Sequence, residues 1–424
     1  MKNPLILKKL IRNPFFIFLP FLFYYSYLIV KSKWPSLYGD EVRYYNFAIN
    51  LIHGFYSPPA PHISLWNGPG FPIILMPFVA LTIYPLYITL MNALYFYLAV
   101  VFLFKALRLI ADYKTALILS LLLAVYPNAL SMLPILYTEA FTNLLVSALV
   151  YTVALYYNKG NKKYGIIAGL ILGYLVLTKI IFGYVVVICL GIFFINLLFK
   201  KNKAYYFKPI RILLIAFAVT VPYLAYTWQL TGKLFYWGNS GGMSLYWMST
   251  PYPHEYGDWK VPYLTNKQYP TLFKSAEVVT ILKKNHQKDI ADVLKHKDNI
   301  EQDEAYKQLA IQNIKNHPLK FMGNCIDNFS RMLFNFPYSY SFQDDSILRG
   351  IIIGYTMGVG IGHWVNLAQL AQNNLCCKVF IITYRGLSFI ERCIKCLPAA
   401  IGHYSARVTF LVRLFNCKYQ KAKL

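Results

Sequence analysis

Carboxylates are rare in the first 230 residues, where the four are Asp40, Glu41, Asp112 and Glu139. Two of them are adjacent, and Asp40-Glu41 opens a segment whose apolar residues recur at helical spacing. Asp40 is therefore expected in the first turn of a helix, where the helix dipole favours a carboxylate. A functional role for this isolated pair of acids needs further residues to support it. The simpler interpretation, a helix start with no chemistry, stays open at this point.

A turn-forming stretch follows this segment. Trp66-Asn-Gly-Pro-Gly70-Phe-Pro72 leads directly into the next apolar run. A capped amphipathic helix, an irregular loop and a Pro-Gly-aromatic-Pro entry into a hydrophobic helix form a composite pattern. The composite is more specific than any one of its parts.

Membrane helices must position these residues. The chain of 424 residues is 57% hydrophobic and 14% charged, whereas soluble domains carry about 25% charged residues. The apolar segments are 14–30, 71–84, 85–104, 115–138, 139–157, 165–199, 210–228 and 347–368. A span needs about 20 residues, so 165–199 must break near Lys179 and 115–138 is one span or two partial ones broken at Tyr126-Pro127-Asn128. The sequence predicts an all-α polytopic membrane protein with about nine to eleven crossings.

Basic clusters indicate the orientation. Residues 2–12, 159–163 and 200–211 are rich in Lys and Arg and are expected in the cytoplasm. The predicted organisation is a transmembrane module over 1–228 with a first external loop at 31–70, an extracytoplasmic insert over 229–346, and one or more membrane helices with a basic, Cys-containing tail over 347–424. The net charge of +25 follows from these clusters. The sequence shows no basic stripe with an element that could read a nucleic-acid groove, so nucleic-acid binding is not expected.

One basic cluster disagrees with this topology. Lys105, Arg108 and Lys114 would lie outside if both 71–84 and 85–104 cross the bilayer. Parity then requires three crossings between 115 and 157, two of them of about 12 residues. Twelve helical residues cover roughly 18 Å of a hydrocarbon core of about 30 Å, so these would be partial helices buried in protein.

The insert differs in kind from the rest of the chain. Residues 230–346 hold twelve of the seventeen acids. The first part, through Pro270, is rich in Tyr, Trp, Gly and Pro and is expected to be loop. Residues 301–334 show apolar spacing that predicts helices. The insert is therefore expected to be mainly helical and to lie outside the membrane.

Several of these motifs together resemble a known family. Gly39-Asp40-Glu41-x-x-Tyr44-x-x-x-Ala48 and Gly68-Pro69-Gly70-Phe71-Pro72 look like the first external loop of bacterial glycosyltransferases related to protein O-mannosyltransferases and aminoarabinose transferases, family 39-like enzymes with the GT-C fold. Tyr137-Thr138-Glu139-Ala140 and Leu177-Thr178-Lys179 fit the same pattern, and Asp303 to Phe321 is similar to the segment before the chain returns to the membrane.

The resemblance implies an inverting transfer of a sugar from a polyprenyl-phosphate carrier to an extracytoplasmic glycan, lipid or protein. Asp40 matches the catalytic acid, and Glu41 would position the acceptor or a divalent metal. Four further residues would bind substrate: Arg43, Tyr44, Glu139 and Lys179. Of these, the cations Arg43 and Lys179 would face the phosphate of the lipid carrier. The plainer interpretations are a surface charge for Arg43, a helix cap for Glu139 and a snorkelling lysine for Lys179. The metal requirement stays open.

The resemblance also implies a place in the cell: a multi-pass cell membrane, the bacterial inner membrane, with the active site on the outer side. Nucleotide sugars are not available there, and no Gly-rich phosphate loop is visible on the cytoplasmic side. Two other classes compete. A transporter or lipid flippase would want ionisable groups near the bilayer midplane, and a scaffold protein would tolerate replacement of Asp40 and Glu41.

Overall fold

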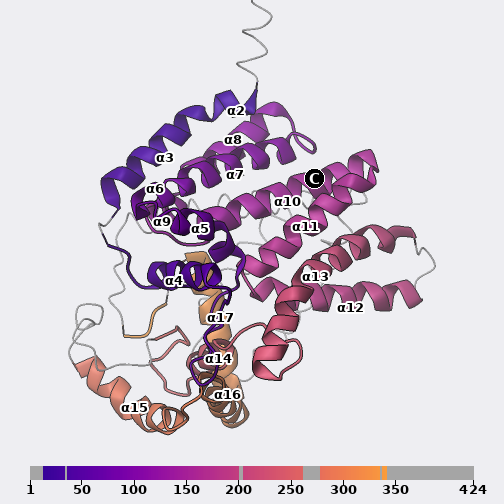
Figure 1. Cartoon of the computed structure of the whole chain (residues 1–424). Helices are drawn as coiled ribbons and strands as arrows, with labels where there is room; N and C mark the ends of the chain where they lie inside the picture. The colour runs from indigo at the N-terminus through magenta and orange to yellow at the C-terminus, as the bar shows by residue number, and fades with distance from the viewer. Residues whose placement is uncertain (1–12, 34–35, 200–203, 261–276, 335–336, 341–424) are drawn as a thin grey trace, which may run out of the picture. The chain divides into compact units, whose positions relative to one another are not determined.

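The protein was analysed as a computed structural model that describes residues 13–33, 36–199, 204–260, 277–334 and 337–340. Regular secondary structure within these residues is helical, as the sequence predicts (Figure 1). The apolar run at 347–368 and the basic tail lie outside the described residues. The division into a transmembrane module, an insert and a C-terminal region stays a prediction.

The helices of the apolar part follow the segments expected from hydropathy. They are α2 (Pro14–Ile17), α3 (Leu19–Ser32), α4 (Asp40–Ile52), α5 (Gly70–Ala80), α6 (Pro85–Thr89), α7 (Met91–Leu107), α8 (Tyr113–Ala124), α9 (Pro127–Met132), α10 (Glu139–Lys159), α11 (Lys162–Thr178), α12 (Ile181–Phe199) and α13 (Ala204–Thr231). The break predicted near Lys179 is confirmed, and of the two alternatives for 115–138 the broken one is observed. Pro127 separates α8 from α9, and Lys179 caps the end of α11 before α12 begins.

The protein is a multi-pass membrane protein by the character of its helices. Four described stretches are long and apolar enough to cross a membrane alone: Pro85–Leu107, Glu139–Lys159, Ile181–Phe199 and Tyr206–Thr231. In the most hydrophobic window of Ile181–Phe199 only 11% of the residues are buried inside the protein. Such an exposed apolar helix needs lipid around it. The number of nine to eleven crossings stays a prediction.

Helices α10 and α11 form an antiparallel pair, side by side in Figure 1. The turn between them is basic and begins at Gly160, whose φ of +67° suits glycine after a helix end. Asn161 then caps α11 by accepting from the backbone N–H of Lys163 at 3.0 Å. Glu139 and Lys179 therefore lie at the other end of this pair, far from the basic turn.

The direction of α7 corrects one expectation. Ring contacts join Phe18 to Phe104 and Tyr25 to Phe96, so α3 and α7 are antiparallel and α7 ends near the start of α2. The ammonium of Lys105 lies 5.4 Å from the ring centroid of Phe15. This basic cluster is thus on the same side as the N-terminal helix, not opposite it. The physical reason is the length of α5, whose eleven residues cover only about 16 Å and cannot cross.

The insert is more helical than expected. It contains α14 (Gly241–Met248), α15 (Glu277–Val293), α16 (Asn299–Asn316) and α17 (Pro318–Phe334). The predicted helices over 301–334 are confirmed, but α14 falls in the part expected to be loop. Tertiary contacts override its weak propensity: the Asp303 carboxylate accepts from the N–H groups of Gly242 (2.8 Å) and Met243 (3.3 Å). Tyr246 and Trp247 are buried against α15 and α16.

Candidate active site

Helix α4 begins at Asp40, as the sequence predicts. Gly39 precedes it with φ of +59°, a conformation that favours glycine. The apolar face of α4 packs against α5 through Tyr44 and Ala48. The Asp40 side chain stays outside this contact and is 45% exposed.

Arg43 stands one turn beyond Asp40 and connects it to the following loop. Its guanidinium lies 3.1 Å from the Asp40 carboxylate and 4.7 Å from the ring centroid of Trp66. It also donates to the amide oxygen of Asn67 at 3.3 Å, and Asn67 donates to the Tyr44 hydroxyl at 3.0 Å. The loop with Trp66 and Asn67 therefore holds one side of α4 in place.

Glu41 behaves differently from its neighbour Asp40. It is 4% exposed, and its carboxylate accepts from the backbone N–H of Leu136 at 2.6 Å and of Tyr38 at 3.1 Å. The buried ammonium of Lys33 completes the set. These contacts join the end of α3, the start of α4 and the segment before α10. Glu41 thus lies beside Asp40 in sequence but points into the protein as an anchor.

A second ion pair comes from two other helices. Glu139, the first residue of α10, accepts from the Lys179 ammonium at 3.0 Å, and the two side chains are 42% and 34% exposed. The second carboxylate oxygen of Glu139 is shielded and has no hydrogen-bond partner in the described part of the chain. A half-used carboxylate beside a partly exposed cation can take a further polar group.

Close approach of two glycines brings the Pro-Gly loop to Lys179. A Cβ on Gly68 would stand 2.0 Å from the Leu177 carbonyl oxygen, and one on Gly70 would stand 2.7 Å from the Thr178 nitrogen. No larger residue fits without moving the end of α11. Tyr174 also donates to the Gly70 carbonyl at 2.8 Å. The loop motif and the motif at the end of α11 therefore meet in space.

The Tyr44 phenol is buried near the carboxylates of both ion pairs. Burial raises the pKa of its phenol, and the charges of Glu139 and Asp40 act in the same direction. The structure thus brings four of the other five sequence-predicted residues near Tyr44, Lys179 through its pairing with Glu139, and both ion pairs are partly open to solvent. The sixth, Glu41, is next to them but buried.

The described residues hold no group of three or more His, Cys, Asp or Glu side chains suited to a metal ion. Asp40, Glu41 and Glu139 each pair with a basic side chain instead. Their oxygens are of the kind that a divalent cation binds, but a basic neighbour already pairs with each carboxylate. No catalytic step is therefore assigned to a metal.

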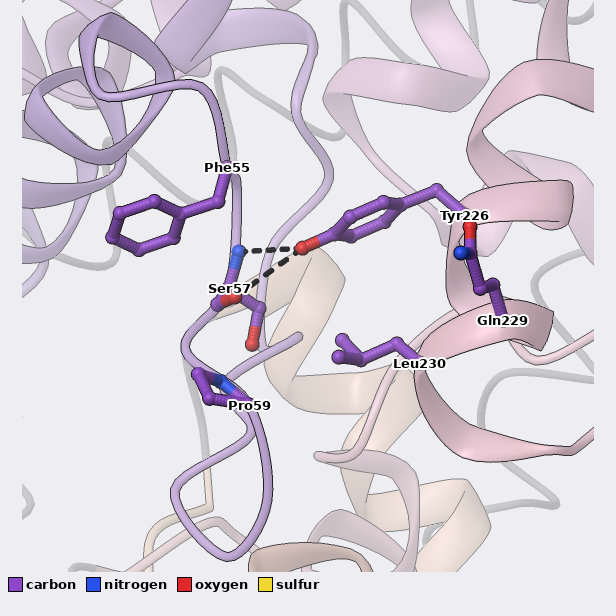
Figure 2. A pocket seen from close by; sticks show the side chains of 6 residues that line it. All are labelled: Phe55, Ser57, Pro59, Tyr226, Gln229 and Leu230. Atoms are coloured by element: carbon purple, nitrogen blue, oxygen red, sulfur yellow. Dashed lines mark hydrogen bonds between the residues drawn. The ribbon is translucent and has the colours of Figure 1, made fainter.

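A cavity of about 440 Å³ lies between the loop after α4 and the end of α13 (Figure 2). Its lining consists of Phe55, Ser57, Pro59, Tyr226, Gln229 and Leu230. The Ser57 N–H donates to the Tyr226 hydroxyl at 2.9 Å across it. Tyr56, between two lining residues, donates to the Asn67 carbonyl at 2.7 Å. The cavity adjoins the ion-pair site but has no charged lining residue, so it does not suit a phosphate.

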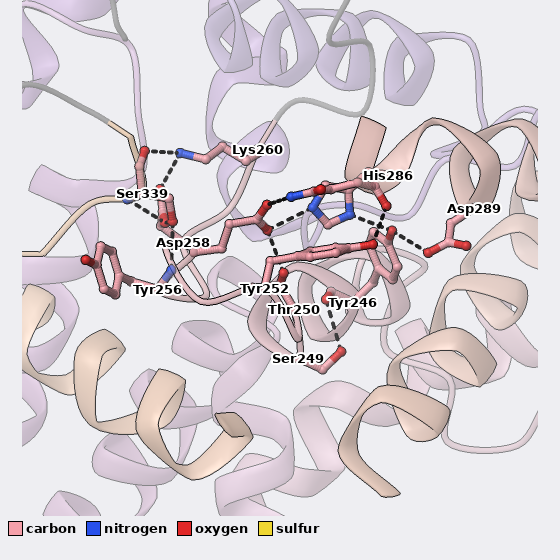
Figure 3. Close-up of polar contacts among 12 residues, drawn as sticks. Tyr246, Ser249, Thr250, Tyr252, Tyr256, Asp258, Lys260, His286, Asp289 and Ser339 are labelled. Carbon is pink, nitrogen blue, oxygen red and sulfur yellow. Dashed lines mark hydrogen bonds and ion pairs between the residues drawn. The ribbon is translucent and has the colours of Figure 1, made fainter. Parts of the chain in front are cut away.

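A second polar cluster, in the insert, was not foreseen from the sequence (Figure 3). Glu255 and His286 are in contact at 2.8 Å, His286 and the Tyr246 hydroxyl at 2.7 Å, and this hydroxyl donates to Asp289 at 2.8 Å. Thr250 donates to Glu255 at 2.5 Å. The partners come from α14, α15 and the loop between them, so no short motif could have revealed them.

One protein family matches part of this chain. A family model described as dolichyl-phosphate-mannose-protein mannosyltransferase matches residues 85–226. This stretch contains Glu139 and Lys179, whereas Asp40 and Arg43 precede it. The match confirms the resemblance to GT-C type glycosyltransferases that the sequence motifs indicate. Together with the apolar helices it supports a membrane glycosyltransferase.

A solved structure with some similarity is the crystal structure of the Archaeoglobus fulgidus oligosaccharyltransferase tethered to an acceptor peptide. The identity is 15% and the TM-score 0.37, over 83% of this chain and 54% of that chain. This chain therefore spans about half the length of that enzyme chain. No curated protein was found to match the chain.

Proposed function

We propose that this protein transfers a sugar from a polyprenyl-phosphate carrier to an acceptor hydroxyl outside the cytoplasm, with inversion at the anomeric carbon. One observation carries the proposal. Two partly exposed ion pairs, Asp40 with Arg43 and Glu139 with Lys179, lie around Tyr44 at the end of the α10–α11 pair opposite its basic turn. Basic turns favour the cytoplasm, so the ion pairs face outward.

Asp40 is the general base of the proposed reaction. Its carboxylate takes the proton of the acceptor hydroxyl while the hydroxyl oxygen forms a bond to the anomeric carbon. The bond from that carbon to the phosphate oxygen breaks at the same time, and its electron pair leaves with the polyprenyl phosphate. Arg43, whose guanidinium lies 3.1 Å from the Asp40 carboxylate, orients that carboxylate toward the acceptor hydroxyl.

The departing phosphate gains negative charge, and catalysis needs a cation fixed where that charge develops. Lys179 supplies it in this proposal. The lysine sits at the end of α11 and is 34% exposed, so a phosphate can reach it without unfolding the helix. Glu139 keeps the Lys179 ammonium in position before the lipid-linked sugar binds. Its shielded second oxygen can then accept a hydrogen bond from a sugar hydroxyl.

A lipid carrier fits the position of this site better than a nucleotide. The prenyl chain can lie among apolar helices such as α12, while its phosphate stays at the outer boundary beside Lys179. Glu41 acts through structure alone in this account, because Lys33 and two backbone N–H groups occupy its carboxylate.

The experiment uses purified protein in proteoliposomes with a panel of polyprenyl-phosphate hexoses and pentoses. Release of polyprenyl phosphate and transfer of label to cell-envelope acceptors are measured, with nucleotide sugars alone as the comparison. Loss of one charge-assisted contact costs about 1.5–3 kcal/mol, so Lys179→Ala is expected to weaken use of the lipid donor about tenfold or more.

Lys163→Ala is the matched control, since Lys163 is an exposed lysine in the first turn of α11, at the end opposite Lys179. It should leave donor use unchanged. Transfer from a nucleotide sugar with no lipid carrier present would refute the proposed donor. Equal donor use by Lys179→Ala and Lys163→Ala would remove Lys179 from the phosphate site.

A further inference from the structure

Helix α17 has an unusual outer face. Among its described side chains, every exposed one is apolar: Pro318, Leu319, Met322, Ile326 and Phe329. The last four are 69%, 53%, 63% and 54% exposed. Their spacing of three and four residues places them in one stripe along the helix. The stripe is about 15 Å long, from a rise of 1.5 Å per residue.

The opposite face of α17 is polar and fixed to the insert. Asn324 is fully buried and donates to the carbonyls of Met248 and Thr250, each at 3.0 Å. Asn328 donates to the Gly257 carbonyl at 3.1 Å, and Arg331 donates to the Tyr256 carbonyl at 3.0 Å. Rotating the helix to hide its apolar stripe would leave these buried partners unsatisfied, which is costly. The helix therefore presents its apolar side outward by construction.

The neighbouring helix α16 shows the ordinary arrangement. Each of its exposed residues is polar: Glu301, Lys307, Gln308, Gln312, Lys315 and Asn316. Its apolar residues Tyr306 and Ala310 are buried against α14. Two consecutive helices of one insert thus face different surroundings. Water suits the outer face of α16, whereas the outer face of α17 requires something apolar.

We propose that the α17 stripe lies against the surface of the lipid bilayer, so that α17 is an interfacial helix that holds the insert on the membrane. Other helices of the same chain span the membrane, so α17 cannot lie far from the bilayer. The apolar run at 347–368 begins about a dozen residues after Phe334, and a dozen extended residues reach at most about 40 Å.

The chemistry of the helix agrees with an interfacial position. Lys320 and Asp327 interrupt its apolar residues, and the charge of each opposes insertion across a bilayer. An amphipathic helix along the surface buries only its apolar face, and nearby cations attract anionic head groups. The proposal does not depend on sugar transfer. If the protein does transfer sugar, α17 would keep the insert beside a lipid-linked sugar whose phosphate lies at the same boundary.

The test measures the surroundings of the stripe in the whole protein. Single cysteines are introduced as Ile326→Cys and, independently, Met322→Cys and Phe329→Cys, in a background without the seven native cysteines. Each is labelled with an environment-sensitive fluorophore in vesicles of phosphatidylethanolamine and phosphatidylglycerol. Gln312→Cys on the polar outer face of α16 is the matched control, and variants that fail to elute as the parent does are set aside. Three stripe positions keep the test possible if one variant misfolds.

At the stripe positions we expect blue-shifted emission, strong quenching by lipids carrying a spin label near the head group, and loss of quenching by aqueous iodide. At Gln312→Cys the reverse is expected. Quenching of the stripe by iodide and not by lipid would mean a free or protein-binding surface and would overturn the proposal. Protection from both quenchers would mean that another part of the chain or a second copy covers the stripe, and would overturn it equally.

Discussion

The two carboxylate clusters of this protein differ in how completely their polar atoms are satisfied. In the candidate site, the Asp40 and Glu139 side chains are 45% and 42% exposed, each has one basic partner, and Glu139 has a shielded oxygen with no described partner. In the insert, Glu255 is 2% exposed, and its two oxygens receive contacts from Thr250, Asn285 and His286. The first cluster has carboxylate oxygens open to further partners, whereas the Glu255 carboxylate of the second is fully paired.

The directions of the hydrogen bonds in the insert show why it is closed. The Tyr246 hydroxyl has one proton and donates it to Asp289, so the facing nitrogen of His286 must donate to the hydroxyl. Both ring nitrogens of His286 are therefore occupied, one by the Tyr246 hydroxyl and the other by the buried carboxylate of Glu255. Such a pair stabilises structure only when its hydrogen bonds are complete, as they are here.

The comparison indicates that the burial of a carboxylate, rather than its presence, distinguishes a candidate catalytic group from a structural one. The same contrast exists within the dipeptide Asp40-Glu41. Asp40 faces solvent with Arg43, while Glu41 is buried by Lys33 and by two backbone N–H groups. Substitutions in the open cluster should therefore change activity, and substitutions in the closed cluster should change stability.

The largest effect is expected at Asp40. Asp40→Asn keeps the size of the side chain and removes its basicity, and general-base catalysis is worth about 10²- to 10⁴-fold. Sugar transfer should fall by that factor while the unfolding temperature and the elution profile stay unchanged. The measurement is the initial rate of transfer in proteoliposomes at saturating donor.

Asp112→Asn is the matched control for this substitution. Asp112 caps α8 by accepting from the N–H groups of Lys114 and Thr115 at 2.9 and 3.3 Å. Asparagine caps helices about as well as aspartate, so both stability and transfer should be kept. An Asp40→Asn protein as active as the Asp112→Asn protein would rule out Asp40 as the base.

A large effect on stability, with no direct effect on chemistry, is expected at Glu255. Glu255→Ala leaves His286 buried without its partner, and breaking a buried pair from one side costs about 3–5 kcal/mol. The insert should unfold at lower denaturant concentration, which hydrogen exchange of α14 and α15 can follow. Exchange of α10 should not change. Unaltered protection of α15 in the variant would show that the network does not hold the insert together.

The sequence revealed those features of the site that depend on local signals. The start of α4 at Asp40, the break at Lys179 and the tight Gly68–Gly70 loop each follow from neighbouring residues. The burial of Glu41 does not, because it depends on the backbone N–H of Leu136, 95 positions away. The contact of Glu255 with His286, 31 positions apart, likewise needs α14 and α15 to be folded together.

Distance along the chain also explains the error about Lys105. Counting crossings treats each apolar run as a span, so a run with the length of α5 placed the Lys105 cluster on the outer side and required extra crossings between 115 and 157 to keep the later clusters in the cytoplasm. The structure replaces counting with contacts, among them Lys105 with Phe15 and Tyr151 at 5.4 and 4.9 Å from the ring centroids. The start of α14 was missed for a related reason, since its cap is the Asp303 carboxylate from a distant helix.

A smaller effect is expected from acid, and its sign differs between two carboxyls of the insert, Glu255 and Asp303. Burial alone would raise the pKa of Glu255, but the hydrogen bond and charge of His286, with Thr250 and Asn285, lower it below the ordinary value. A carboxyl with a lowered pKa in the folded state stabilises the protein above its unfolded pKa of about 4.3. That stability is lost as the pH falls through the folded pKa. Protection of α15 from hydrogen exchange should thus stay constant from neutral pH to about pH 5 and decline below about pH 4.

Asp303 contributes with the opposite sign, since burial raises its pKa despite the N–H groups of Met243 and Gly242. Protonation is therefore easier in the folded state, and this carboxyl favours the fold as the pH falls. The decline in α15 should consequently be stronger than any change at the start of α14, where Asp303 accepts its hydrogen bonds. Glu255→Gln is the deciding variant, because a side chain that cannot titrate should remove the acid step in α15. A decline of the same size in Glu255→Gln would assign the acid response to another group and leave the closed cluster without a role in it.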